Sequence, residues 1–263
     1  MTRRSFFPAL PACTFSACRP RGSVRREAIL GAFLISGNGD EPIPDSVVII
    51  EEERIREAGP REAIPVPEGS RKRHAHGAFL APAPIDLSAQ RESLPVVRSI
   101  EELRERVEAG AHGVVGTLTE NERIEPGLLD RMYMRSVVWA PMLSRLAESP
   151  RLLEVAQRNT RTAADAGVPL GVAAAGNGIE AIVVELELMR DAGLSPAHLI
   201  VSATRNGALA LRRENVAGTI LAGRRADLLL LEANPLEDIR NLRRVRRRMS
   251  AGQWIAPSPK RTS

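Results

Sequence analysis

The sequence predicts an α/β fold in which two β flanks enclose an α/β middle. Between residues 81 and 215, short apolar runs alternate with helical segments, a pattern typical of βαβ units and a parallel sheet. Residues 27–80 and 216–257 contain mainly strand-like segments. The simplest arrangement pairs these two flanks into one small β domain and inserts the middle between them.

The first 26 residues form an arginine-rich tail that we expect to be disordered. They contain six arginines and no acidic residue, so they account for the basic excess behind the net charge of +5. Residues 2–7, TRRSFF, resemble a twin-arginine export signal, but Pro8 and Pro11 interrupt the apolar stretch that follows. We therefore expect a cytoplasmic protein, with export as the alternative.

The N-terminal flank reads as three strands. Residues 28–36, AILGAFLIS, form one apolar strand. Residues 46–59, SVVIIEEERIREAG, form two strands joined by a tight turn at 51–53.

The middle begins with a helix that Ser99 caps, with Glu102 at the capping-box position. Further helices are expected at 128–134, 151–167 and 179–193, and from Ser195-Pro196 to about residue 211. Four apolar runs are candidate strands of a parallel sheet: 80–87, 113–118, 136–141 and 168–174.

The C-terminal flank returns to β structure over residues 218–234, followed by a hairpin at 245–255 that turns at Ala251-Gly252. Five arginines lie within residues 243–248, but no aromatic residue is interleaved with them. We interpret them as the solvated side of a strand, and we do not expect a nucleic-acid partner.

Two further counts limit the class of protein. No apolar run approaches the ~20 residues that a membrane span needs. The two cysteines, Cys13 and Cys18, both lie in the tail, which excludes a disulfide framework and a cysteine-rich zinc site.

Several stretches resemble the amidohydrolase superfamily, and its imidazolonepropionase-like branch in particular. Residues 193–255, from GLSPAHLIVSATRNGALAL to the closing AGQWI, are similar to that family's last helix and closing β segment. Residues 29–60 resemble its opening β segment, and 76–87, HGAFLAPAPIDL, its entry into the first barrel strand. Shorter similarities cover 108–118, 136–146 and 154–176.

The resemblance implies a TIM-like (β/α) barrel of the metal-dependent hydrolases, plus a small composite β-sandwich domain from both chain ends. It also implies a reaction, in which zinc or another divalent metal activates water to hydrolyse a C–N bond in a cyclic amide, an imide or a dipeptide-like substrate. Histidine and carboxylate ligands at the carboxyl ends of the barrel strands would hold the metal.

Carried over position by position, the family's ligands are missing. Its first strand ends in a His-x-His pair, where this chain has Ser88 and Gln90. Before Gly116-Thr117 the family has a histidine, and none is present here. The aspartate of its last strand is replaced by Ala175. We therefore expect no cofactor in this chain.

The lengths indicate a truncated barrel. Residues 81–215 leave about 135 residues for it, against ~250 in a whole barrel. The missing half would have been lost between about Glu92 and Ser99, and residues 258–263 form a C-terminal tail. A partial barrel exposes two strand edges, so we expect a homo-oligomer in which two copies close against each other.

Three other side chains are weak alternative metal ligands. His74 and His76 would project to one side of a strand, but they precede the first barrel strand by about a dozen residues. Asp86 matches the family's aspartate before the lost histidine pair. Ser88 lacks the Gly-x-Ser-x-Gly context of a nucleophilic serine.

The sequence thus predicts a catalytically degenerate member of a hydrolase family, and whether it is an enzyme stays open. The alternatives are an active hydrolase with relocated metal ligands and a non-catalytic scaffold or binding protein.

Overall fold

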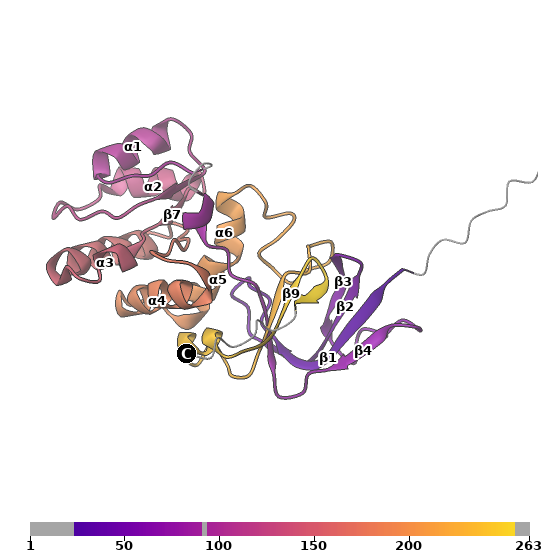
Figure 1. The fold of residues 1–263 in the computed structure, drawn as a ribbon. Helices are drawn as coiled ribbons and strands as arrows, with labels where there is room; N and C mark the ends of the chain where they lie inside the picture. The colour runs from indigo at the N-terminus through magenta and orange to yellow at the C-terminus, as the bar shows by residue number, and fades with distance from the viewer. Residues whose placement is uncertain (1–23, 91–93, 256–263) are drawn as a thin grey trace, which may run out of the picture.

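The computed structural model describes residues 24–90 and 94–255. Its strand-rich and helix-rich parts lie side by side (Figure 1). The twin-arginine-like segment and the C-terminal tail, 258–263, lie outside the described residues.

One eight-stranded sheet forms the strand-rich part, in the order β10-β9-β8-β5-β1-β2-β3, with β4 also paired to β1. Its strands are β1 (Arg26–Leu34), β2 (Ile43–Glu51), β3 (Arg54–Pro60), β4 (Arg71–His74), β5 (Phe79–Pro82), β8 (Leu228–Leu231), β9 (Val245–Ser250) and β10 (Gln253–Ile255). The antiparallel pair β5–β8 joins the N-terminal strands to the C-terminal ones.

Strand β8 shows why the sheet takes this position. All four of its leucines are buried. Because alternate side chains of a strand point to opposite faces, these leucines must pack in two different cores. Leu228 and Leu230 pack in a core within the sheet, while Leu229 and Leu231 pack in the core that the helices share. The sheet is therefore buried on both faces at this point.

The two predicted hairpin turns are confirmed, and they lie against each other. The β2–β3 turn places Glu52 at a φ of 53°, and the β9–β10 turn places Ala251 and Gly252 at 45° and 71°. A Cβ on Gly252 would overlap the Glu52 carbonyl, so only glycine lets the turns approach this closely.

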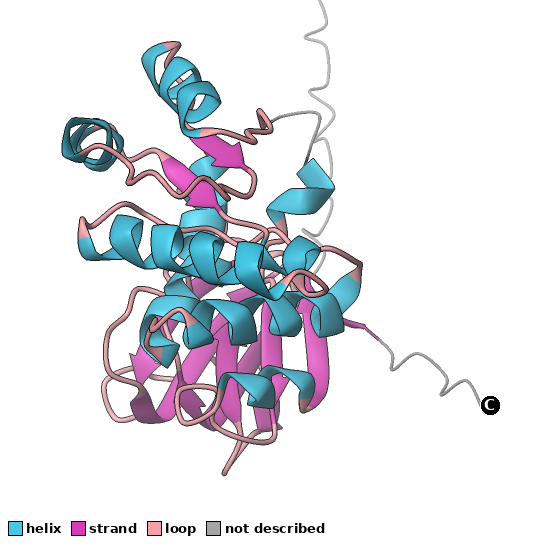
Figure 2. Cartoon of the chain, turned by 90° about the vertical axis from the view of Figure 1, so that its left-hand side faces the viewer, coloured by secondary structure: helices cyan, strands magenta, loops and turns pink. Residues whose placement is uncertain are grey.

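The helix-rich part contains a two-stranded parallel sheet, β6 (Gly113–Val115) and β7 (Val138–Ala140), and six α-helices. The helices are α1 (Ile100–Glu108), α2 (Pro126–Met134), α3 (Pro150–Asp165), α4 (Gly178–Asp191), α5 (Pro196–Ala203) and α6 (Arg205–Ala210). Three 3₁₀ helices add η1 (Leu87–Gln90), η2 (Leu143–Leu146) and η3 (Ile239–Arg243). Figure 2 shows several of these helices in front of the large sheet, while others lie above it beside the small two-stranded sheet.

Extended segments widen the β6–β7 pair into what we call the parallel array. Val96 bridges to Val115 of β6, and Leu170 bridges to Trp139 of β7, both in parallel. Beyond residue 170, the Leu87 amide donates to the Val172 carbonyl at 2.8 Å. The array therefore runs in the order 94–97, β6, β7, 169–174 and 85–87.

Helix α1 begins as predicted, with the Ser99 side chain accepting from the Glu102 amide at 3.0 Å. The Glu102 carboxylate accepts from the Arg98 amide at 2.7 Å, one residue before the position that a capping box uses. Gly167, at a φ of 77°, follows α3 as expected.

The predicted strand 80–87 is not one continuous strand of the parallel sheet. Strand β5 ends at Pro82 and belongs to the large sheet, and η1 begins at Leu87. Pro82 and Pro84 lack the N–H that a ladder needs, and the Asp86 side chain accepts from the Ser88 amide, which starts a turn.

Three further predictions need correction. Segment 168–174 is extended but makes a single bridge, at Leu170. The helix expected to reach residue 211 is broken at Thr204, whose backbone has left the helical region. Arg243 lies in η3 and not on a strand, and its partly exposed side chain pairs with Glu180 at 2.8 Å and Glu187 at 2.9 Å on α4.

The main core fills the space between the helices and the large sheet. Trp139 is its largest fully buried side chain, and the indole N–H donates to the Gly116 carbonyl at 2.8 Å. Among the described residues, none of the helices has the length and apolarity that crossing a bilayer requires.

Candidate functional site

A group of polar side chains gathers where the parallel array ends. It comprises Asp86 within segment 85–87 and Ser88 directly after it, Ser144 after β7, Ala175 after 169–174, and Glu185 on α4. We call it the strand-end cluster. The carboxyl ends of parallel strands are where α/β proteins usually place their chemistry.

Within the described residues, the Asp86 carboxylate accepts hydrogen bonds from its own strand end and from the neighbouring segment 169–174. One carboxylate oxygen accepts from the Ser88 amide at 2.9 Å and from the Ala174 amide at 3.2 Å. The other accepts from the Ser88 hydroxyl at 2.9 Å. Asp86 thus ties η1 to segment 169–174, and its carboxylate is already engaged by three donors.

Glu185 is the second carboxyl of the cluster, and it is fully buried. One of its oxygens accepts from the Leu143 amide at 2.7 Å, and the other from the Ser144 amide at 2.8 Å. Burial raises the pKa of Glu185 to about 7, the hydrogen bonds from Ser144 and Leu143 oppose this shift, and the charge of Asp86 adds to it.

Ser144 connects this carboxyl to the array. Its hydroxyl oxygen accepts from the Ala175 amide at 2.9 Å, so α4, η2 and segment 169–174 share one network. The chain reaches η2 through Met142, whose backbone is left-handed with a φ of 49°. The Met142 carbonyl accepts from the Thr117 hydroxyl at 3.2 Å, which adds the end of β6.

Two of the three positions that the resemblance predicts to be emptied, Ser88 and Ala175, lie in this cluster. Ser88 bonds to Asp86, and Ala175 bonds to Ser144. Gln90 ends η1, two residues after Ser88. The structure thus brings the first and last of these strand ends together.

The donors present do not fit a divalent transition metal. Such a metal prefers imidazole and free carboxylate ligands, but the cluster has no histidine and both of its carboxyls accept backbone N–H bonds. In residues 24–90 and 94–255, no group of three or more His, Cys, Asp or Glu side chains could hold a metal.

His74 and His76 lie elsewhere, in the large sheet. His74 ends β4, where it is opposite Leu30 of β1, and His76 lies in the turn that follows. Their rings stack with centroids 5.8 Å apart, and both residues are exposed. The structure does not bring them to Asp86, and metal binding by this pair stays a prediction.

A cavity of about 570 Å³ lies beside Asp86. Segment 85–87 is the last in the order of the array, and the cavity lies on its open side. Apolar side chains, including Ile85, Leu211 and Met249, form part of its wall, and Arg213 and Arg248 add positive charge. It is large enough for a small-molecule ligand.

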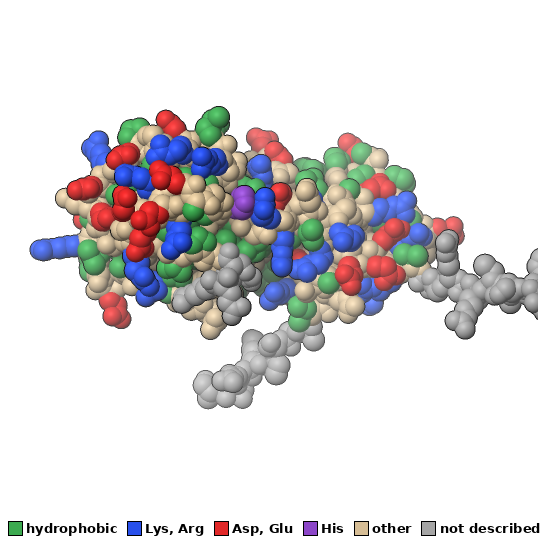
Figure 3. All heavy atoms as spheres, turned by 90° about the horizontal axis from the view of Figure 1, so that it is seen from above, with side chains coloured by type: hydrophobic (Ala, Val, Ile, Leu, Met, Phe, Trp, Pro, Cys, Tyr) green, Lys and Arg blue, Asp and Glu red, His purple; other side chains and the backbone are tan. Residues whose placement is uncertain are grey.

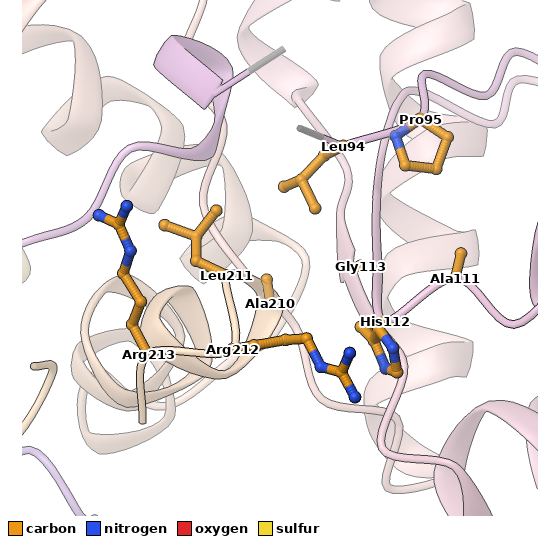
Figure 4. A pocket seen from close by; sticks show the side chains of 9 residues that line it. All are labelled: Leu94, Pro95, Ala111, His112, Gly113, Ala210, Leu211, Arg212 and Arg213. Carbon is orange, nitrogen blue, oxygen red and sulfur yellow. The ribbon is translucent and has the colours of Figure 1, made fainter. Parts of the chain in front are cut away.

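A second pocket, of about 280 Å³, lies at the opposite end of the array (Figure 4). It contains His112, which immediately precedes β6, and Arg212, whose side chain points toward His112 (Figure 4). The amino-terminal ends of barrel strands generally serve stability, so this pocket is a weaker candidate than the strand-end cluster.

Sequence reasoning missed Glu185 and Ser144. A signal existed for Glu185, because it lies within the apolar stripe of α4 beside Ile182, Leu186 and Met189. A carboxyl in such a stripe must be paired or neutral. Ser144 gave no such signal.

Comparison by sequence places the chain near one family. The model described as "Amidohydrolase family" matches residues 69–255. None of the curated proteins matches the chain significantly.

Solved structures with a similar fold include three hydrolases with low sequence identity. Molinate hydrolase has a TM-score of 0.73 at 15% identity, covering 88% of this chain and 95% of that one. A putative prolidase from Bifidobacterium longum has 0.70 at 17%, covering 91% and 97%. A. niger ochratoxinase has 0.67 at 13%, covering 88% and 95%. The α/β fold is therefore shared with these proteins.

Proposed function

Because the chain belongs to the amidohydrolase family, we propose that it is a catalytically degenerate member, which binds a ligand without metal-dependent hydrolysis. The observation that carries the proposal is the state of the strand-end cluster. The resemblance places Ser88 and Ala175 at the family's ligand positions, and Asp86 already accepts three hydrogen bonds from Ser88 and Ala174.

The chemistry of the family explains why this observation matters. A metal-bound water reaches a useful pKa only when imidazoles and carboxylates hold the metal in an open coordination. The cluster offers hydroxyls, an alanine and two hydrogen-bonded carboxyls. We therefore derive no hydrolytic step through a metal at this site.

We also propose that the chain is a truncated relative of the imidazolonepropionase-like branch. The stretches at 29–60 and 193–255 support the branch. The parallel array supports truncation, because within the described residues it ends at 94–97 on one side and at 85–87 on the other. A closed barrel has no such edges.

If the cluster does not hydrolyse a substrate through a metal, the function that we propose for the cavity beside Asp86 is ligand binding. Its volume of about 570 Å³ and its mixture of apolar side chains and arginines are typical of small-molecule sites. An active hydrolase whose ligands have moved to His74, His76 and Asp86 finds less support, because these residues lie in two different parts of the fold.

Amide hydrolysis with and without a chelator tests the proposal. We expect no turnover of cyclic amide or dipeptide-like substrates by wild type after zinc loading. Zinc-dependent turnover that a chelator abolishes would overturn it. If such turnover disappeared in the His74→Ala/His76→Ala variant, the relocated site would be correct.

A restored variant provides the matched comparison. Ser88→His, Gln90→His and Ala175→Asp together return the family's ligand types to the positions that we infer to be vacated. We expect this variant to take up more zinc per chain than wild type. Equal uptake would show that the three positions are not former ligand positions.

A further inference from the structure

The strongest unexplained feature of the surface is a group of arginines at one end of the large sheet. Five of them, with Glu27 and Trp254, surround a cavity of about 330 Å³. We call it the arginine cluster; its arginines are Arg25, Arg26, Arg71, Arg73 and Arg247. By contrast, the face of the molecule in Figure 3 mixes acidic and basic side chains over the helical part.

The fold assembles this cluster from both ends of the chain. In the β1–β4 pair, Arg71 lies opposite Glu27, and Arg73 lies two residues further along β4. From the C-terminal hairpin, β10 supplies Trp254 and β9 supplies Arg247. The sequence alone did not show that an aromatic residue accompanies these arginines.

Glu27 organises the centre of the cluster. Its exposed fraction is only 9%, and its carboxylate accepts from the Arg73 Nε–H at 2.8 Å and from the indole N–H of Trp254. The Arg73 guanidinium also stacks on the Trp254 ring, 4.8 Å from the centroid. Arg73 and Trp254 are therefore held in place before any ligand binds.

The remaining arginines differ in how they are neutralised. Arg26 pairs with Glu51 at 2.6 Å, and Arg25 approaches Glu52 at 4.0 Å. Within the described part of the chain, Arg71 and Arg247 form no salt bridge, and both are exposed. Glu27, Glu51 and Glu52 thus neutralise three of the five arginines that line the cavity, which leaves an excess of two positive charges on Arg71 and Arg247.

We propose that the arginine cluster binds the phosphate groups of a small polyphosphate, either a nucleoside triphosphate or inorganic polyphosphate. Guanidinium groups donate two parallel hydrogen bonds to phosphate oxygens, and Arg71 and Arg247 line the same cavity as the fixed Arg73 with donors available. A ligand with several negative charges matches this excess of positive charge.

A single nucleic-acid strand fits the cluster less well. Strand-binding surfaces present several aromatic side chains on which successive bases stack. Here one face of Trp254, the single aromatic residue lining the cavity, is occupied by Arg73. The proposal concerns the large sheet and does not depend on the proposed function.

Tryptophan fluorescence can test the proposal, because Trp139 is fully buried and Trp254 lies in the cluster. Tripolyphosphate, ATP and inorganic phosphate would be titrated into the full chain at constant ionic strength. We expect saturable binding of tripolyphosphate and ATP, with inorganic phosphate at least 10-fold weaker. Tighter binding of ATP would identify a nucleotide, and equal binding would identify the phosphates alone.

Matched variants separate a site from general charge attraction. We expect Arg71→Ala and Arg247→Ala each to weaken tripolyphosphate binding about 10-fold, which corresponds to the loss of one charged hydrogen-bond pair. The control is Arg246→Ala, which removes the same charge from the neighbouring position of β9, outside the cavity lining. It should change the affinity less than two-fold.

Three results would overturn the proposal. They are an absence of saturable binding, an equal loss in Arg246→Ala, and binding of a single-stranded oligonucleotide that tripolyphosphate does not displace.

Discussion

Glu185 shows at the scale of one residue what the sequence could and could not reveal. Its place in the apolar stripe of α4 marks it as unusual, but its partners come from η2, 41 and 42 residues earlier in the chain. Asp86 and Ser88 were singled out from the sequence, whereas the hydrogen bond from the Ala174 amide to Asp86 depends on the tertiary fold.

The raised pKa of Glu185 predicts that stability depends on pH. Its folded pKa of about 7 lies above the ordinary value of 4.5, so the folded state binds this proton more tightly. The resulting stability is fully present below pH 4.5 and is lost as the pH rises through 7. The shift corresponds to about 3 kcal/mol of unfolding free energy.

The variant Glu185→Gln tests this prediction through urea unfolding at several pH values. Glutamine cannot release a proton, so the variant should lack the fall in stability between about pH 5 and pH 8. The control Glu180→Gln makes the same change at a largely exposed position of α4, and it should keep the fall. An identical pH profile in wild type and Glu185→Gln would contradict the assignment.

At the scale of elements, local signals predicted the helices and hairpins well. Ser99 caps α1, and the hairpin turn lies at Ala251-Gly252, as the local sequence predicted. The errors in the bounds of the elements lie where prolines interrupt a strand or where tertiary contacts break a helix. Pro82 and Pro84 end a strand that apolar periodicity extends, and Thr204 breaks a helix where Gly207 packs closely on Ile85.

Gly116 provides a test of the parallel array. A Cβ at this position would overlap the Val97 carbonyl oxygen, because segment 94–97 lies directly against the end of β6. We expect Gly116→Ala to lower the free energy of unfolding by about 1–3 kcal/mol.

The control for this substitution is Gly127→Ala on α2. A Cβ there meets only the Arg131 guanidinium at 3.6 Å. Alanine also favours helix, so this variant should be neutral or stabilised by up to ~1 kcal/mol. Thermal or urea unfolding of the two variants makes the comparison. A neutral Gly116→Ala would contradict the close packing of 94–97 on β6.

For the whole molecule, the resemblance to a known family predicted more than hydrophobic periodicity alone could predict. The family model confirms the amidohydrolase resemblance, and the large sheet combines strands from residues 26–82 and 228–255. No local pattern requires β5 to pair with β8, some 150 residues away. The domain bounds, the truncation and the loss of activity stay proposals, because they concern ancestry and chemistry rather than chain geometry.

The two edges of the parallel array predict self-association. Val96 lies on the edge segment with an exposed fraction of 39%. We expect sedimentation to give twice the chain mass of 28.6 kDa. Val96→Lys should shift the protein toward monomer, whereas Val184→Lys on α4, at a similar exposed fraction of 41%, should not. A monomeric mass at all concentrations would rule out a dimer.

Metal content tests the central claim most directly. Elemental analysis of purified, tag-free wild type would give zinc, manganese and iron per chain. Degeneracy of the strand-end cluster predicts less than about a tenth of a metal ion per chain. One or two tightly held ions per chain would contradict it and would mean that this chain retains a metal centre outside the positions inferred from Ser88 and Ala175.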